Sequence, residues 1–251
     1  MLAHTMSAQQ AQPSYTTVAC LKVSPAQTAA YREFATTTTK ALMQHAANSG
    51  RITSWSLMRA VMPTGSEARC DYMSVIGYTG TPPEPLDRES LTKRLASANI
   101  PMTADQYYAK RDSLSRLVSQ EMFQSLIRVG QPAKGHYVFL NQMKVHKAAD
   151  YVKFEREVWR PMAEQWVKQG DQSGWTFGAR LFPSGTEVPH SMFSADVYPT
   201  WAAAFKNRGT QAVFEKAHPG KNYQETMAPL SSLRDLARRD LLRVEERVVK
   251  Q

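Results

Sequence analysis

LFPSGTEV occupies residues 181–188 of this 251-residue chain, and VMPTGSEA occupies residues 61–68. Each segment follows an apolar run that contains a tryptophan, Trp175 in one case and Trp55 in the other. Both carry a proline followed two residues later by a glycine, a pattern that suits a tight connection between antiparallel strands. Two such similar segments so far apart indicate that the chain contains one structural unit twice.

The same spacing of about 120 residues relates other positions. The pairs that keep it are Trp55 with Trp175, Pro63 with Pro183, Gly65 with Gly185, Glu67 with Glu187, Ser74 with Ser194 and Tyr78 with Tyr198. Chance does not maintain a register across so many pairs, so a tandem duplication sets the fold of the whole chain.

The residue pattern of each copy predicts the same order of strands and helices. β-branched and apolar residues predict strands, and apolar residues at helical spacing that stop at Gly50 and Gly170 predict helices. The first copy reads as strand 15–23, helix 29–50, strands 52–62 and 70–78 and helix 103–120, and the second as strand 137–145, helix 149–170, strands 173–182 and 190–198 and helix 223–239. Residues 121–129 and 240–248 then either end the second helix or form a fourth strand.

With a fourth strand, each copy has the order β-α-β-β-α-β of a ferredoxin-like unit. We therefore expect an α+β fold made of two tandem ferredoxin-like repeats, at residues 15–129 and 137–251, joined by a linker at 130–136. Residues 1–14 are expected to be a disordered tail or the remnant of a signal peptide.

This pattern resembles the dimeric α+β barrel superfamily, and in particular its members similar to antibiotic-biosynthesis monooxygenases. The resemblance rests on a strand ending in Lys-Val, an amphipathic helix, a tryptophan-bearing strand, the PTGSE or PSGTE turn and a strand ending in Tyr, in both copies. It implies that two ferredoxin-like units pair their sheets into one barrel within this chain. Superfamily relatives include cofactor-free oxygenases, lactone isomerases, polyketide cyclases and haem-dependent enzymes, and a ligand often lies between the sheet and its helices.

The W-x(7)-P-x-G-[ST]-E signature also resembles uncharacterised bacterial proteins that are often exported. The N-terminal segment MLAHTMSAQQAQPSY is polar and rich in small residues, which fits the end of a secretory signal. Export is therefore favoured over a cytoplasmic location. Cys20 and Cys70 fall in predicted strands, where buried free thiols are the simpler interpretation and a disulfide requires neighbouring strands.

The composition is that of an ordinary globular protein, with 42% hydrophobic and 21% charged residues. A net charge of +9 permits an acidic partner, but the sequence matches no known nucleic-acid module. Much of the excess lies in residues 234–250, where arginines alternate with Asp and Glu, which favours a solvated, salt-bridged helix. No apolar run reaches about 18 residues, so no membrane span is expected.

The candidate catalytic residues are His190 and His45. Strand alternation places His190 on one face with Asp196 and Tyr198, although the position of His190 at the start of the strand favours a solvent-facing side chain. His45 lies on the apolar stripe of helix 29–50, where it is either a base or haem ligand or a partly buried histidine bonded to a carbonyl. The six histidines show no HxH or HxxxH spacing, so no metal site is predicted.

Ligand-binding candidates come mainly from places where the copies differ. They are Trp159, Arg160, Asp196, Tyr198, Tyr108 and Arg111. Trp159 could stack on a flat ligand while Arg160 pairs with a carboxylate, against the simpler interpretation of a packed tryptophan and a solvated arginine. Tyr108 and Arg111 open the second helix of the first copy, where they could rim a pocket. Trp55, Trp175 and the paired tyrosines are expected to be core.

Three functions remain open. The first is a small-molecule-binding enzyme of the cofactor-independent oxygenase or isomerase type, acting on an apolar or aromatic molecule. The second is an exported, non-catalytic binding or structural barrel. The third is a haem protein with His45 or His190 as axial ligand, although no cofactor is the leading expectation. The chain would act as a monomeric pseudo-dimer or as a homodimer.

Overall fold

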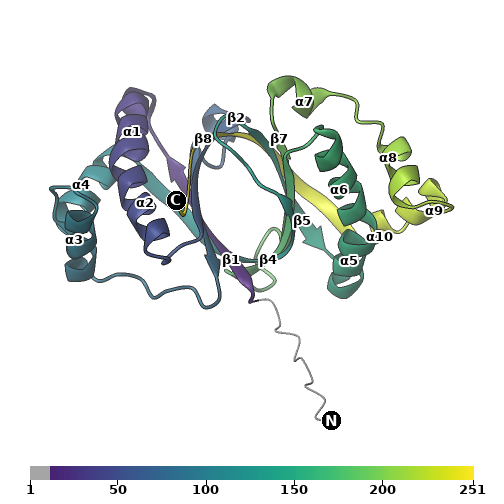
Figure 1. The fold of residues 1–251 in the computed structure, drawn as a ribbon, viewed down its shortest axis with the longest axis horizontal. Coiled ribbons are helices and arrows are strands. Elements are labelled where there is room, and N and C mark those ends of the chain that lie inside the picture. Colours follow the sequence, from purple (N-terminus) through teal and green to yellow (C-terminus); the bar gives the residue numbers. More distant parts are fainter. Residues whose placement is uncertain (1–11) are drawn as a thin grey trace, which may run out of the picture.

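A closed barrel of eight strands forms the centre of the computed structural model, which describes residues 12–251 (Figure 1). The prediction for the N-terminal tail therefore lies largely outside the described residues. The first repeat contains β1 (Ser14–Lys22), α1 (Thr28–Phe34), α2 (Lys40–Asn48), β2 (Ser54–Met62), β3 (Tyr72–Thr79), α3 (Arg88–Ser97), α4 (Ala104–Leu114) and β4 (Arg116–Gly130). The second contains β5 (Tyr137–Val145), α5 (Ala148–Phe154), α6 (Arg160–Gln169), β6 (Gly174–Phe182), β7 (Met192–Tyr198), α7 (Trp201–Phe205), α8 (Thr210–Ala217), α9 (Tyr223–Met227), α10 (Leu230–Leu233) and β8 (Arg234–Val249).

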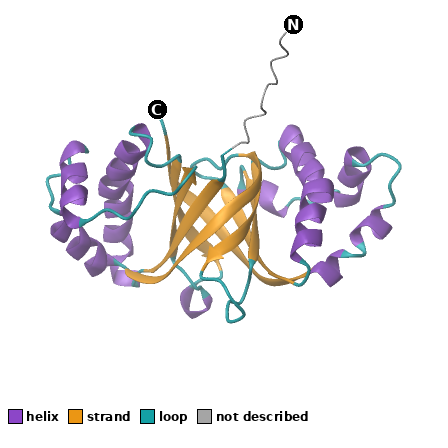
Figure 2. Ribbon diagram, turned by 90° about the horizontal axis from the view of Figure 1, so that it is seen from below, coloured by secondary structure: helices purple, strands orange, loops and turns teal. Residues whose placement is uncertain are grey.

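The strand order confirms two ferredoxin-like units that close one barrel. The order around the barrel is β1-β3-β2-β8-β5-β7-β6-β4, and every pairing is antiparallel. Each repeat contributes four neighbouring strands, and the pairs β2–β8 and β4–β6 join the two repeats. The helices of the two repeats cover opposite sides of the barrel (Figures 1 and 2).

The two quoted segments form the β2–β3 and β6–β7 connections. The peptide bonds before Pro63 and Pro183 are both cis. Gly65 has a φ of +66° and Gly185 a φ of +118°, in the region that side chains other than glycine rarely adopt. The turn chemistry therefore explains why both copies keep proline and glycine here.

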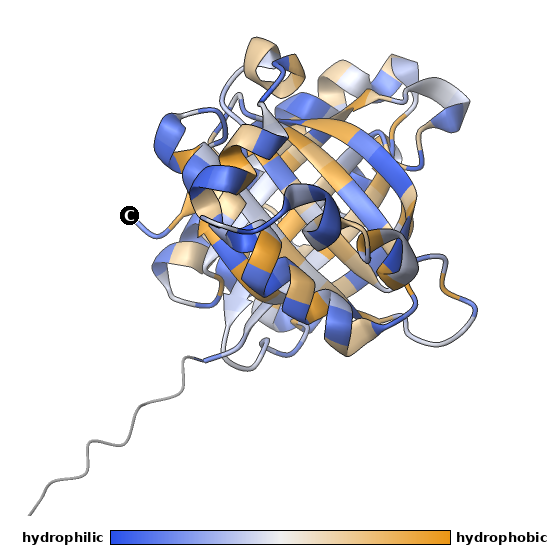
Figure 3. Cartoon of the chain, turned by 90° about the vertical axis from the view of Figure 1, so that its right-hand side faces the viewer, coloured by the Kyte–Doolittle hydropathy of each residue, from blue (hydrophilic) through white to orange (hydrophobic). Residues whose placement is uncertain are grey.

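Three apolar clusters hold the fold together. One lies between the sheet and helices of the first repeat, one lies in the same place in the second repeat, and one fills much of the barrel interior. Hydrophobic and hydrophilic positions accordingly mix along the helices and strands (Figure 3). Trp55 and Trp175 are fully buried in the two outer clusters, which confirms the prediction that they are core residues.

The fourth strands are longer than predicted. The helix expected over 103–120 ends at Leu114, and β4 begins at Arg116. The helix expected over 223–239 is wrong from Arg234 onward, because β8 begins there. The prediction of a solvated helical face is therefore wrong for Glu245 and Glu246, whose side chains are 3% and 5% exposed within ion pairs, whereas Asp235 at the start of β8 is 63% exposed. In a strand such as β8, successive residues face opposite sides of the sheet. A helical assignment of the same residues does not separate these two faces.

The two cysteines form a disulfide, so the interpretation as free thiols is wrong. Cys20 lies in β1, whereas Cys70 lies just before β3 rather than in it. The pairing of β1 with β3 brings the two residues together. No helix within residues 12–251 is long and apolar enough to cross a membrane.

Candidate functional site

A cavity of about 160 Å³ lies between the sheet of the first repeat and its helices. Its aromatic walls come from α1, β2 and α4: Tyr31, Phe34, Trp55 and Tyr107. Polar groups at its edge include Ser74 of β3 and Arg111 of α4. The cavity thus combines apolar walls with a few hydrogen-bonding groups, as small-molecule sites do.

The polar groups of this cavity are held in place by neighbouring side chains. The Thr39 hydroxyl lies 3.2 Å from the Tyr107 hydroxyl, and Trp55 Nε1 donates to Ser74 Oγ at 2.9 Å. Burial raises the pKa of Tyr31 and the pKa of Tyr107, so both phenols are neutral near pH 7. The buried lining therefore offers neutral hydroxyls for hydrogen bonding.

Of the predicted ligand-binding residues, Arg111 lies at this cavity, and Tyr108 contacts Arg111 without lining the cavity. The Arg111 guanidinium carbon lies 4.8 Å from the centre of the Tyr108 ring. His45 is half-buried on α2 and does not line the cavity. Asp112, the carboxylate of the lining, has a side chain that is 63% exposed. The described residues that line this site include aromatic side chains but no buried carboxylate or histidine.

The corresponding layer of the second repeat contains buried polar side chains. Asp196 accepts a hydrogen bond from Asn141 Nδ2 at 2.8 Å, and Gln172 Nε2 donates to the Tyr198 hydroxyl at 3.4 Å. The guanidinium carbon of Arg208 lies 5.1 Å from the Tyr198 ring. The predicted candidates Asp196 and Tyr198 therefore belong to one buried network on the helix-covered face of β7.

Glu155 also belongs to this layer, and it was not predicted as a functional residue. It begins a π-helical turn at Glu155–Trp159, and the first repeat has a matching π-helical turn that begins with Ala35. Glu155 is 5% exposed, and its Oε2 atom has no hydrogen-bond partner among residues 12–251. Burial raises the pKa of Glu155 to about 7, and the carboxyl of Asp196 adds to the rise. The difference between Ala35 in the first repeat and Glu155 at the matching position of the second could have indicated this residue.

Trp159 and Arg160 do not converge on this network. Trp159 packs on Trp166 with ring centres 5.9 Å apart, and Arg160 pairs with Glu164 at 2.8 Å on the surface of α6. The simpler interpretation of a packed tryptophan and a solvated arginine thus describes their environment.

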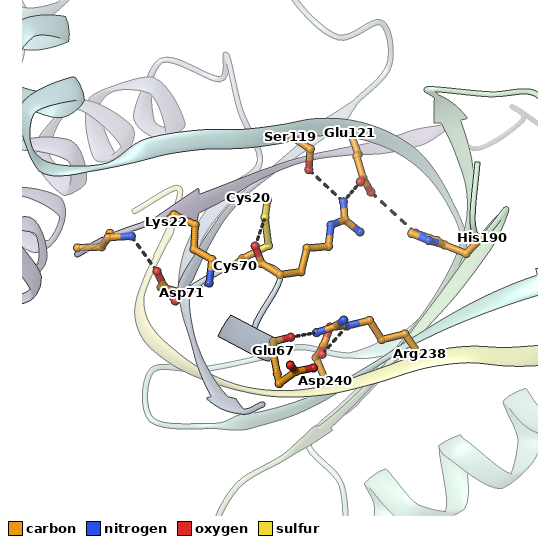
Figure 4. Close-up of a disulfide and its surroundings, with 12 residues drawn as sticks. Cys20, Lys22, Glu67, Cys70, Asp71, Ser119, Glu121, His190, Arg238 and Asp240 are labelled. Atoms are coloured by element: carbon orange, nitrogen blue, oxygen red, sulfur yellow. Dashed lines mark hydrogen bonds and ion pairs between the residues drawn. A yellow bond between two sulfur atoms is a disulfide. The ribbon is translucent and has the colours of Figure 1, made fainter. Parts of the chain in front are cut away.

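His190 lies inside the barrel, so the prediction of a solvent-facing side chain is wrong. It is 2% exposed and lines a second cavity, of about 90 Å³, in the barrel interior. His190 lies before β7 begins at Met192, so the predicted strand alternation does not extend to it, and it does not share the helix-covered face of Asp196. Its ring contacts Arg180, and its Nε2 atom lies 3.9 Å from Glu121 Oε2 (Figure 4). Desolvation, with the charges of Arg180 and Arg69, lowers the pKa of His190 to about 3, so the ring is neutral.

His190 is not free to bind a haem iron, and neither cavity described above has the volume of a typical cofactor pocket. Arg180 Nη2 lies 3.0 Å from Nδ1 of His190 and also contacts Nε2, so the guanidinium occupies the direction from which iron would bind. The cavities that contain His190 and Arg111 measure about 90 and 160 Å³, well below the roughly 300–1,000 Å³ of typical cofactor pockets. Within residues 12–251, no three His, Cys, Asp or Glu side chains gather to hold a metal ion.

Two solved structures share this architecture at full length. A protein assigned as a monooxygenase from Lactobacillus acidophilus superposes with a TM-score of 0.51 and 12% identity, covering 96% of this chain and 100% of that one. A second assigned monooxygenase, from Fusobacterium nucleatum, gives a TM-score of 0.54 and 10% identity, covering 96% of each chain. No protein-family model and no curated protein matches the sequence. The comparisons and the strand order together show that this chain has the dimeric α+β barrel fold, closed within one polypeptide.

Proposed function

We propose that the protein binds a small aromatic molecule in the cavity between the sheet and helices of its first repeat. The observation that supports the proposal is the lining of this cavity. Four aromatic side chains and several hydroxyl groups surround a volume of about 160 Å³. A cavity of roughly 150 Å³ is large enough for benzene. Arg111 at the edge favours a substituent with negative charge, so the preferred ligand class is an aryl carboxylate, and phenol is its uncharged comparison.

Calorimetric titration with phenol and benzoate tests this proposal. Ala35 lines the cavity and is 3% exposed, so Ala35→Leu fills the cavity and should abolish binding. Thr39→Val removes the hydroxyl that faces Tyr107 and should weaken binding about tenfold, whereas Thr37→Val on the exposed side of the same turn should not. Unchanged affinity in Ala35→Leu would place any binding elsewhere.

The second candidate function is proton-transfer catalysis by Glu155. A carboxyl group whose pKa lies near 7 can accept and return a proton at neutral pH, and its unpartnered Oε2 atom supports this role. An isomerase or cofactor-independent oxygenase needs such a base. Exchange of carbon-bound hydrogen for deuterium in enolisable aromatic ketones, followed by NMR, measures this activity. Loss of exchange in Glu155→Gln, with normal exchange in Glu157→Gln, is expected; equal exchange in both variants would exclude Glu155.

We also propose that the protein works in an oxidising compartment, as an exported protein would. The Cys20–Cys70 disulfide supports this location, because disulfides persist mainly outside the cytosol. Alkylation of denatured, unreduced protein from its own host should add no mass. Two alkylated thiols would place the protein in a reducing compartment.

A further inference from the structure

The barrel interior has a charged end and an apolar remainder. Apolar side chains line most of the cavity of about 90 Å³, among them Val18, Met73, Val138 and Leu242. The charged end lies where the β2–β3 and β6–β7 connections meet the barrel. Arg69, Glu121 and His190 line the cavity there, and Arg180, Arg238 and Asp240 lie near them without lining it. An amphipathic cavity of this kind suits a ligand that has one polar end.

Cations outnumber anions at this end. Glu121 pairs with both Arg69 and Arg180, and its Oε2 atom lies 3.0 Å from Arg180 Nη2. Arg238 pairs with Asp240 through both carboxylate oxygens, at 2.8 and 2.9 Å. Three guanidinium groups therefore face two carboxylates beside a neutral histidine. One further negative charge would balance the cluster.

Arg180 is the group with unused bonding capacity. Its side chain is 3% exposed, and its Nε atom is buried without a hydrogen-bond partner among residues 12–251. The Arg69 side chain is 26% exposed, so Arg69 lies nearer to solvent than Arg180. Figure 4 shows Ser119 and Glu121 on the strand at the top, Arg238 with Asp240 below them, and His190 to the right. Arg69 is therefore the guanidinium that a ligand in the cavity would contact, with Arg180 on the other side of Glu121.

We propose that the barrel interior is a second binding site, specific for a short aliphatic carboxylate. Its head pairs with Arg69, with Arg180 adding positive charge from beyond Glu121, and its tail contacts the apolar walls. A guanidinium group can bind a carboxylate through two parallel hydrogen bonds, and Arg69 is the guanidinium that lines this cavity. A volume of about 90 Å³ equals that of roughly three water molecules, so only short chains fit. The differences between the repeats support this site, because Arg180 and His190 stand where the first repeat has Ala60 and Cys70.

Propionate and propionamide, titrated into the oxidised full-length protein, are the first test. The two probes have nearly the same shape and differ in charge. Propionate should shift the ring resonances of His190 in a saturable manner, and propionamide should bind at least about tenfold more weakly. Affinity should rise about fourfold from propionate to butyrate and be lost for octanoate. Equal binding of propionate and propionamide would overturn the proposal.

Three arginine variants complete the test. Arg180→Met and Arg69→Met should each weaken propionate binding at least about tenfold, and Arg160→Met on the surface of α6 should leave it unchanged. If Arg180→Met fails to fold, Arg69→Met and the comparison of propionate with propionamide still test the proposal. Ala35→Leu should not affect propionate, because it fills the other cavity. Binding that survives both Arg180→Met and Arg69→Met, or that disappears in Ala35→Leu, would refute a site inside the barrel.

Discussion

Replacing Glu155 with glutamine should make the protein more stable at alkaline pH and remove part of its pH dependence. The pKa of Glu155 is about 7 in the folded protein and about 4.5 when unfolded, so the folded state holds the proton more tightly. The free energy of unfolding therefore falls as pH rises from about 4.5 to about 7, and the loss is complete above that range. A shift of this size corresponds to about 3 kcal/mol. Glutamine keeps the shape and cannot ionise, so the variant avoids this loss.

Urea denaturation of wild type, Glu155→Gln and Glu157→Gln at pH 5 and pH 8 measures this effect. We expect similar stability for wild type and Glu155→Gln at pH 5. At pH 8 we expect Glu155→Gln to gain about 2–3 kcal/mol, or roughly 5–10 °C in Tm for a chain of this length. Glu157 is exposed on the same π-helical turn, so Glu157→Gln should follow wild type at both pH values. A Glu155→Gln variant that loses as much stability as wild type between pH 5 and pH 8 would refute the reasoning.

Three further predictions concern stability. Replacing both Cys20 and Cys70 with alanine should lower the free energy of unfolding by about 4 kcal/mol, because the disulfide closes a loop with a sequence separation of 50. As a control, the double variant and wild type reduced with dithiothreitol should unfold at the same urea concentration. Trp55→Phe should destabilise by about 1 kcal/mol more than Trp175→Phe, since only Trp55 Nε1 has a hydrogen-bond partner among the described residues, and equal losses in urea denaturation would contradict this. Gly178→Ala should cost at least about 2 kcal/mol, because its Cβ would lie 2.6 Å from the Gln124 carbonyl oxygen; a smaller loss of Tm than in Gly185→Ala would show that β4 can move aside.

The repeat was enough to predict the barrel, because turn residues and buried tryptophans are set by local backbone and core requirements that both copies share. The fourth strands were harder, because buried acidic residues lie among arginines in β8, which therefore lacks a simple alternation of polar and apolar residues. The side on which His190 lies was unpredictable, since it depends on the connection before β7 rather than on the strand itself.

The chemically active groups of the second repeat depend on tertiary burial. Glu155 is unremarkable in sequence, and its raised pKa arises only when the π-helical turn packs on the sheet beside Asp196. Tyr108 and Arg111 were placed near a pocket by comparing the copies, and Arg111 does line a cavity. The same comparison applied to Ala35 and Glu155 would have identified the buried carboxyl.

The seams β2–β8 and β4–β6 have an evolutionary consequence. In a barrel assembled from two identical subunits, any substitution appears on both sides of the symmetry axis, so a mutation that improves one site also alters its twin. A covalent connection between the halves removes that constraint, and it also keeps the barrel closed at any protein concentration. One half can then specialise in holding an apolar ring while the other accumulates ionisable groups, without either change having to be tolerated twice.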